Sequence, residues 1–233
     1  MTKTVLVTGA ASGIGLAQVQ LFLEKGYVVY GVDKSSSPDV FHPNFTFFQL
    51  DLKENLGSLY NQVPQVDVLC NTAGILDDYK PLLAISEDDF QSVMETNFFA
   101  TVKLTRHYLE KMVANKSGII ITMCSIASFL ADGGGAAYTS SKHALAGFTR
   151  QLALDYAKDG IQVFGIAPGA VKTGMTAADF EPVGLADWVA DQTPLGRWTQ
   201  PEEVAELTLM LASGKLSSMQ GEIVKIDGGW SLK

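Results

Sequence analysis

The chain has 233 residues, of which 47% are hydrophobic and 18% are charged, and its formal net charge is −8. A chain of this length and composition is expected to form a globular domain with a sizeable core. The negative charge argues against nonspecific binding to nucleic acid or to an anionic membrane surface, because both need basic patches. No apolar run approaches the roughly 18 residues of a membrane span, and the first residues do not form a signal peptide, so we expect a cytoplasmic protein.

Strand-like and helical patterns alternate along the chain. Short runs rich in β-branched and aromatic residues predict strands at residues 4–8, 27–32, 45–50, 66–70, 118–124, 161–167 and 222–226. Helical patterns lie between them, at about residues 13–25, 53–62, 87–95, 98–114, 138–158 and 201–212. Several of these strands are apolar at consecutive positions, as burial on both faces requires. The sequence therefore predicts a single α/β domain over residues 1–233, with a Rossmann-type, doubly wound parallel seven-stranded sheet and helices on both faces.

The two cysteines, Cys70 and Cys124, fit neither a metal-binding motif nor a disulfide framework. Both stand at the ends of apolar, strand-like runs, so we expect buried free thiols with no role in the chemistry. The sequence predicts no metal site.

The first predicted strand runs into the stretch TGAASGIG, residues 8–15, which places glycines at positions 9, 13 and 15 between a strand and a helix. Glycine allows a sharp turn and a close approach of the backbone to a ligand. The start of the following helix offers free N–H groups and a positive dipole end to a pyrophosphate. The glycine spacing, G-x-x-x-G-x-G, at this place in a parallel sheet predicts a dinucleotide site.

Asp33 closes the second predicted strand, 24 residues after Gly9. A carboxylate at this point can accept hydrogen bonds from the ribose hydroxyls of adenosine and would repel a 2′-phosphate, which favours NAD over NADP. Lys34 follows directly and could soften that repulsion. The alternative is that Asp33 is only the polar end of a strand.

Tyr138 and Lys142 lie in the stretch AAYTSSKHAL, residues 136–145, and their spacing of four places them on one face of the predicted helix. A cation close to a phenol favours the ionised phenol, so Lys142 is expected to lower the pKa of Tyr138 and make it usable as a general acid or base. By itself the pair is weak evidence, because tyrosine beside a lysine with an extended side chain is common on helix surfaces.

Taken together, the motifs resemble the short-chain dehydrogenase/reductase family in its single-domain form, over about residues 4–230. Beside the glycine-rich loop, the stretch NTAG at 71–74 is similar to the family's N-N-A-G, and the threonine at its second position is expected to have little consequence. PGAVKT at 168–173 resembles the segment that contacts the nicotinamide end, and IDGGW at 226–230 resembles the C-terminal strand and turn. By this resemblance the cofactor-binding residues are Gly9, Ser12, Gly13, Ile14, Gly15, Asp33, Asp51, Leu52, Asn71, Ala73, Gly74, Tyr138, Lys142, Pro168, Gly169, Val171 and Thr173.

The resemblance also implies a catalytic tetrad of Asn97, Ser125, Tyr138 and Lys142. Tyr138 would protonate the oxygen of a carbonyl that receives a hydride from the nicotinamide. Lys142 would also hold the nicotinamide ribose, and Ser125 would donate a hydrogen bond to the same substrate oxygen. Asn97 would lie in a locally disturbed helix and hold a water through which Lys142 is reprotonated.

The resemblance therefore implies transfer of a hydride between NAD(H) and a small secondary alcohol or ketone. The chain also resembles 3-oxoacyl-acyl carrier protein reductases, but it has Ser12 where those enzymes carry a basic residue. Its expected substrate lid, about residues 173–198, carries four acidic residues and no basic residue between Thr173 and Gly196, which disfavours an acidic carrier protein unless other segments supply cations.

Two further alternatives fit less well. A dinucleotide-binding sensor without chemistry would be expected to lose the tyrosine or the lysine, whereas all four tetrad positions are filled here. An enoyl reductase would have a longer spacing between tyrosine and lysine. We also expect a homotetramer, built on the helices at about 98–114 and 138–158 and on the C-terminal segment around Trp230, and a cap of Thr199 with Glu202 at the start of helix 201–212.

Overall fold

The computed structural model describes residues 2–131 and 133–232. Its centre is a seven-stranded sheet whose neighbouring strands all pair in parallel, in the order β3-β2-β1-β4-β5-β6-β7. The strands are β1 (Thr4–Thr8), β2 (Val28–Asp33), β3 (Phe45–Gln49), β4 (Val68–Asn71), β5 (Gly118–Met123), β6 (Ile161–Pro168) and β7 (Ile223–Ile226). The predicted parallel seven-stranded sheet is confirmed.

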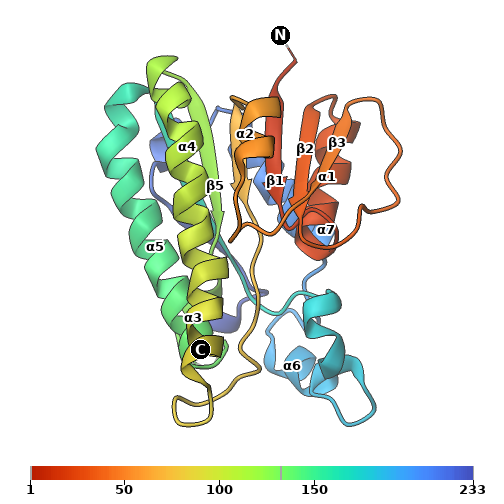
Figure 1. The fold of residues 1–233 in the computed structure, drawn as a ribbon. Helices are drawn as coiled ribbons and strands as arrows, with labels where there is room; N and C mark the ends of the chain where they lie inside the picture. Colours follow the sequence, from red (N-terminus) through yellow and green to blue (C-terminus); the bar gives the residue numbers. More distant parts are fainter. Residues whose placement is uncertain (1, 132, 233) are drawn as a thin grey trace.

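Helices cover both faces of this sheet, as predicted (Figure 1). They are α1 (Gly13–Glu24), α2 (Gly57–Gln62), α3 (Glu87–Met94), α4 (Ala100–Ala114), α5 (Ala136–Tyr156), α6 (Ala186–Gln192) and α7 (Pro201–Ala212). In Figure 1, α4 and α5 lie on one side of the sheet, and α1 and α7 lie on the other, where they pack against each other. Helix α6 lies beyond the carboxyl ends of the strands.

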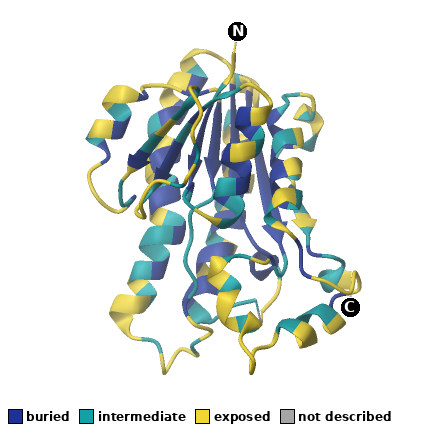
Figure 2. Cartoon of the chain, turned by 90° about the vertical axis from the view of Figure 1, so that its right-hand side faces the viewer, coloured by how far each residue is buried: buried dark blue, intermediate teal, exposed yellow. Residues whose placement is uncertain are grey.

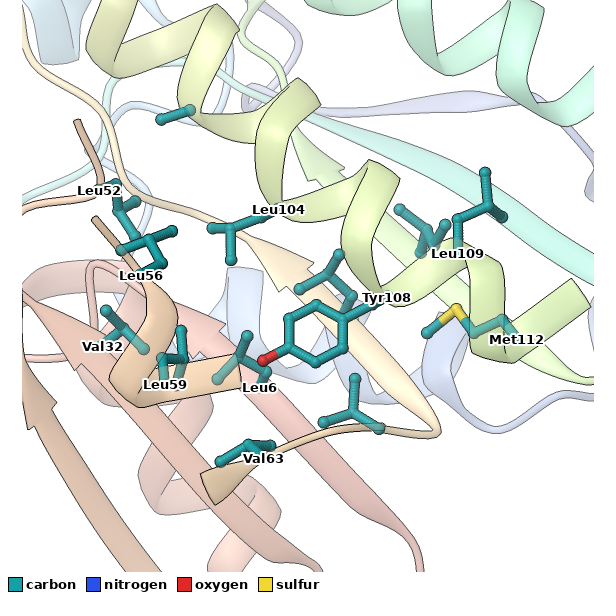
Figure 3. Close-up of a cluster of buried hydrophobic side chains, with 14 of the residues drawn as sticks. Leu6, Val32, Leu52, Leu56, Leu59, Val63, Leu104, Tyr108, Leu109 and Met112 are labelled. Carbon is teal, nitrogen blue, oxygen red and sulfur yellow. The ribbon is translucent and has the colours of Figure 1, made fainter. Parts of the chain in front are cut away.

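Successive residues of the central strands enter opposite layers of the core, which explains why these strands are apolar at consecutive positions. In β1, Leu6 packs into the layer that contains Leu59, Leu104 and Tyr108 (Figure 3). Its neighbours Val5 and Val7 pack into the opposite layer, together with side chains of α1 and α7. Figure 2 shows the result, with buried strands at the centre and exposed residues on the outer surfaces of the helices and on the loops.

A π-helical turn, Glu95–Phe99, joins α3 to α4 and contains Asn97. The local disturbance of the helix that was expected at this residue is therefore present. Single π-helical turns inside helices occur often at functional sites.

The expected cap of α7 is wrong by one residue. Gln200, not Thr199, precedes the first helical residue, and its backbone N–H donates to Glu203 Oε2 at 2.8 Å. Thr199 lies one residue farther from the helix, in an isolated parallel bridge with Val171, and Pro201 is the first helical residue.

Candidate active site

A cavity of about 760 Å³ opens at the carboxyl edge of the sheet, where the strand order reverses between β1 and β4. Open parallel sheets of this class bind ligands at that edge. Two of the predicted site residues, Asn71 and Asn97, do not line the cavity. All the others do: Gly9, Ser12, Gly13, Ile14, Gly15, Asp33, Asp51, Leu52, Ala73, Gly74, Ser125, Tyr138, Lys142, Pro168, Gly169, Val171 and Thr173.

Asn71 points away from the cavity, into the core. Its side chain is 3% exposed, and its Nδ2 donates to Thr105 Oγ1 of α4 at 3.0 Å. The place of Asn71 among the cofactor-binding residues stays a prediction. Asn71 instead ties the end of β4 to α4.

The glycine-rich loop has no room for side chains at its critical points. A Cβ atom on Gly15 would lie 2.0 Å from the carbonyl oxygen of Gly9, and one on Gly9 would lie 3.0 Å from the Cα of Ala73. Gly9 and Gly13 also have positive φ angles of 70° and 53°. No side chain caps the first turn of α1, which begins at Gly13, so its N–H groups are available to an anion at the cavity.

The carboxylate of Asp33 is hydrogen-bonded to the backbone of this loop and to the residues that follow β2. Its Oδ2 accepts the backbone N–H of Ala11 at 3.1 Å, and its Oδ1 accepts that of Ser35 at 2.9 Å. Each carboxylate oxygen can accept a further hydrogen bond, and Asp33 lines the cavity together with Lys34. The orientation of the carboxylate is therefore fixed by two hydrogen bonds to the backbone.

The loop that follows β4 is tied to its surroundings by a chain of hydroxyl and amide groups. Thr8 Oγ1 accepts the N–H groups of Thr72 and Ala73, at 2.9 and 3.0 Å. The Thr72 hydroxyl donates to Gln18 Oε1 at 2.7 Å, and Gln18 Nε2 donates to Thr208 Oγ1 at 2.8 Å. The threonine at the second position of NTAG thus connects the loop through the fully buried Gln18 to α7.

Tyr138 and Lys142 are both buried in the first two turns of α5, with exposed fractions of 9% and 3%. The Tyr138 hydroxyl is hydrogen-bonded to Ser125. Ser125 caps the short turn Ile126–Ser128, and Ser128 Oγ donates to the carbonyl of Lys142 at 2.7 Å. The structure therefore brings the predicted serine, tyrosine and lysine together at one end of the cavity.

The expected lowering of the Tyr138 pKa is wrong for this arrangement. Burial raises the pKa of Tyr138 to about 12, although the hydrogen bond with Ser125 opposes this. Lys142 Nζ lies 5.4 Å from the centroid of the tyrosine ring and donates to the carbonyl of Met123 at 2.8 Å. Burial also lowers the pKa of Lys142 to about 8. Tyr138 therefore carries its proton at neutral pH.

Asn97 does not line the cavity, but its side chain connects the loop after β4 to α5. It is completely buried, and its side chain exchanges two hydrogen bonds with the backbone of Ile75, at 2.8 and 3.0 Å. Its Nδ2 also donates to Ser141 Oγ at 3.0 Å. These contacts fix the loop after β4 against α5, and the water-holding role of Asn97 stays a prediction.

Comparisons with known proteins agree with this geometry. The family model "short chain dehydrogenase" matches residues 3–183. A short-chain dehydrogenase of Rhodocybe pseudopiperita, ple7, is 34% identical over 255 residues, which cover 99% of this chain and 98% of the relative. The chain belongs to the short-chain dehydrogenase/reductase family. It is therefore an oxidoreductase acting on CH–OH or C=O groups.

Other members of the family differ in substrate and cofactor. The 3-oxoacyl-[acyl-carrier-protein] reductase of Chlamydia pneumoniae is 33% identical over 241 residues, covering 97% of this chain and 96% of the relative. The structure of 4-hydroxyisoleucine dehydrogenase complexed with NADH superposes with a TM-score of 0.93 at 30% identity, over the full length of both chains. ElxO with NADP bound gives 0.91 at 26% identity, again over both full lengths. A nicotinamide dinucleotide is thus the common cofactor.

This short-chain dehydrogenase also has a site residue that the sequence analysis missed. Asp77, in the loop after β4, is 5% exposed, and its carboxylate accepts the backbone N–H groups of Gly135 and Tyr138 at 2.7 and 2.9 Å. It thereby anchors the first turn of α5, which begins two residues earlier than predicted. No local pattern indicates this contact, because 61 residues separate Asp77 from Tyr138.

Among the described residues, no group of three or more His, Cys, Asp or Glu side chains could hold a metal ion. Within the same part of the chain, no helix is long and apolar enough to cross a membrane. Cys70 and Cys124 are buried and free, as predicted, and burial raises the pKa of both thiols.

Replacing Thr72 by valine should lower the free energy of unfolding by about 1–3 kcal/mol, because the buried Gln18 would lose the donor to its Oε1. Thr72→Ser keeps the hydroxyl and serves as the control. Urea unfolding of the three proteins measures the difference. A valine variant as stable as the parent would show that the connection through Gln18 contributes nothing.

Replacing Asp77 by asparagine should shift the pH dependence of alcohol oxidation to lower pH. The charge of Asp77 helps to raise the pKa of Tyr138, so its removal lowers that pKa, and the deprotonated tyrosine that would act as the base in oxidation forms at lower pH. The readout is the midpoint of the profile of kcat/KM against pH.

The neighbouring residue provides the control for that experiment. Asp78 is an exposed carboxylate 3.5 Å from Lys80, and its contacts do not reach α5, so Asp78→Asn should leave the midpoint in place. An unchanged midpoint in a folded Asp77→Asn variant would restrict Asp77 to a purely structural role.

Proposed function

We propose that this protein transfers a hydride between NAD(H) and a secondary alcohol or ketone, with Tyr138 as the proton donor and acceptor. The observation that carries the proposal is the buried cluster of Tyr138, Ser125 and Lys142, which shares one cavity with the glycine-rich loop and Asp33. The proposal includes a cytoplasmic, single-domain enzyme in which residues 173–198 act as the substrate lid.

The cavity fits a dinucleotide at the residues of its inner end. A Cβ atom on Gly9 or Gly15 would clash with the backbone of Ala73 or of Gly9 itself, so glycine is needed for the loop to fold this tightly beside the cavity. The uncapped start of α1 would bind the pyrophosphate, and Asp33 would accept hydrogen bonds from the adenosine ribose. When bound, the nicotinamide supplies the hydride for the reaction.

Side chains of the protein carry out the proton transfer that accompanies the hydride transfer. In the direction of reduction, Tyr138 donates its proton to the substrate oxygen, on which negative charge develops, and Ser125 donates a hydrogen bond to the same atom. A phenol whose pKa is raised to about 12 is fully protonated at neutral pH and ready for this step. In the direction of oxidation, Tyr138 must first lose its proton, so the reaction should run faster as the pH rises.

Lys142 is suited to two tasks near this proton. A Cβ atom placed on Gly74 would lie 3.6 Å from Lys142 Nζ, so the ammonium group borders the bare backbone where the nicotinamide ribose would bind. With its pKa lowered to about 8, Lys142 can release and regain a proton near neutral pH. We assign to it the binding of the ribose and the resupply of the proton to Tyr138.

A reductase of 3-oxoacyl groups on an acyl carrier protein is the second candidate, and the relative from Chlamydia pneumoniae supports it. An acidic carrier protein would need exposed cations around the lid. Arg197, at the end of the lid, is paired with Glu203 at 2.8 Å, and Lys172 lies 5.1 Å over the ring of Phe180. Because these cations are engaged, a free small-molecule substrate is favoured.

Exposed apolar residues support the proposed homotetramer. Phe99, in the π-helical turn before α4, is 56% exposed, and Leu154 of α5 is 75% exposed. Exposed, large apolar side chains at the start of α4 and on α5 are suited to a contact with a second copy of the chain.

Tyr138→Phe should remove almost all turnover, by about 10²–10⁴-fold, because it deletes the proton donor without changing the shape of the side chain. NADH binding, measured by the change in its fluorescence, should persist and shows that the variant is folded. Substantial turnover by this variant, followed by absorbance of the nicotinamide, would refute the assigned role.

The parent protein should prefer NAD(H) over NADP(H) by at least about tenfold in kcat/KM. Charge-assisted hydrogen bonds of the kind assigned to Asp33 contribute about 1.5–3 kcal/mol, and about 1.4 kcal/mol corresponds to tenfold. Asp33→Ala should reduce the ratio of the two efficiencies, since it removes both the acceptor and the repulsion of a 2′-phosphate.

The ratio is the appropriate readout because Asp33→Ala also frees the N–H of Ala11 and so weakens binding of both cofactors. Asp39→Ala, an exposed carboxylate that does not line the cavity, is the matched control. Equal efficiencies with the two cofactors in the parent protein would show that Asp33 does not select between them.

A further inference from the structure

Most of the charged side chains that line the cavity lie at the proposed adenosine position, away from the lid. Five of the described residues that line it are charged: Asp33, Lys34, Asp51, Lys142 and Asp179. Asp33 ends β2, Lys34 follows it and Asp51 follows β3, all at the proposed adenosine position, whereas Lys142 lies beside Tyr138. On the side of the lid, the described lining therefore holds one charge, the carboxylate of Asp179.

Among the described residues that line the cavity, no cation lies on that side, so a carboxylate or phosphate of a substrate would find no counter-ion in the lining there. Burying such a group without a partner is costly, and Asp179 would repel it. The cation that follows the loop after β4 is engaged elsewhere, since Lys80 lies 3.5 Å from Asp78. The electrostatics of this end of the cavity thus select against anions.

Two tryptophans from distant parts of the sequence form the wall on the same side. Trp188 of α6 and Trp230 of the C-terminal segment both line the cavity, and their rings meet edge to face with centroids 6.3 Å apart. Trp188 is nevertheless 52% exposed. Large aromatic surfaces that are already in place but half uncovered are suited to the flat, apolar body of a ligand.

The backbone conformation and hydrogen bonds of the C-terminal turn fix the position of Trp230. Gly228 and Gly229 have φ angles of 61° and 89°, and the carboxylate of Asp227 accepts the N–H groups of Gly229 and Ser231 at 2.9 and 3.0 Å. Leu195, at the end of the lid, donates its N–H to the carbonyl of Gly228 at 3.0 Å. The C-terminal turn and the lid are thereby joined, and the aromatic wall is preformed.

We propose that the substrate is a neutral alcohol or ketone with a bulky apolar body, and that Trp188 and Trp230 hold this body while Asp179 excludes anionic substrates. This inference rests on the proposed hydride transfer at Tyr138. It separates this enzyme from 4-hydroxyisoleucine dehydrogenase, because an amino acid carries a carboxylate.

The first test compares matched ketones under one assay of nicotinamide absorbance. 2-Decalone, a neutral fused-ring ketone, should exceed cyclohexanone by about tenfold or more in kcat/KM, in keeping with the discrimination available to an apolar pocket. 4-Methylcyclohexanone should exceed 4-oxocyclohexanecarboxylate, which has a similar size and one negative charge, by at least about tenfold.

Two substitutions assign these preferences to residues. Trp188→Ala should lower the ratio of the efficiencies for 2-decalone and cyclohexanone by about tenfold, whereas Val183→Ala should not change it. Val183 lies in the same lid, is 94% exposed and does not line the cavity. Asp179→Asn should raise the efficiency for the carboxylate ketone relative to 4-methylcyclohexanone, and the exposed Asp187→Asn, also outside the lining, is its control.

The outcomes distinguish the two levels of the proposal. Turnover with equal or greater efficiency for the carboxylate ketone, or a Trp188→Ala variant with an unchanged ratio, would overturn the assigned substrate class and leave the hydride transfer standing. Bound NADH without turnover of any of the four ketones would instead overturn the proposed function, and the substrate inference with it.

Discussion

The arrangement of the site depends on one constraint, the parallel pairing of all seven strands. Parallel strands deliver their carboxyl ends to a single edge, and the reversal of strand order between β1 and β4 opens a crevice there. Segments that are far apart in the sequence meet at this crevice: the glycine-rich loop after β1, Asp33 at the end of β2, the serine after β5 and Thr173 after β6. Loops attached to buried strands can carry these groups with little freedom, as catalysis requires.

Helix α5 completes the site, and long-range contacts hold its first turns. Asp77 accepts two N–H groups at its start, Ser128 donates to the carbonyl of Lys142, and Lys142 itself donates to the carbonyl of Met123. These bonds connect the helix to the loops after β4 and β5 on either side of the cavity. The relative position of Tyr138 and Ser125, on which the proposed proton transfer depends, is therefore set by tertiary contacts of both residues.

The burial that these contacts impose also sets the proton affinities. A phenol taken out of water resists ionisation and an ammonium group taken out of water resists protonation, so the pKa of Tyr138 rises and that of Lys142 falls. Burial therefore favours the protonated form of Tyr138 and the deprotonated form of Lys142. The remaining charges of the cavity lining lie at the proposed adenosine position or, as Asp179, on the proposed lid, which leaves the apolar wall that we assign to the substrate.

Local sequence determined much of this protein: the seven strands and their parallel arrangement, the glycine-rich loop, Asp33 at its strand end, and the spacing of Tyr138 and Lys142 on one helix. These features are readable because backbone freedom and hydrophobic periodicity are local properties. The direction of the Tyr138 pKa shift was not readable, since it depends on how many atoms of other segments surround the phenol. Nor were Asp77, the cap at Gln200, the orientation of Asn71 or the meeting of Trp188 with Trp230, because each is decided by a partner brought close only by the fold.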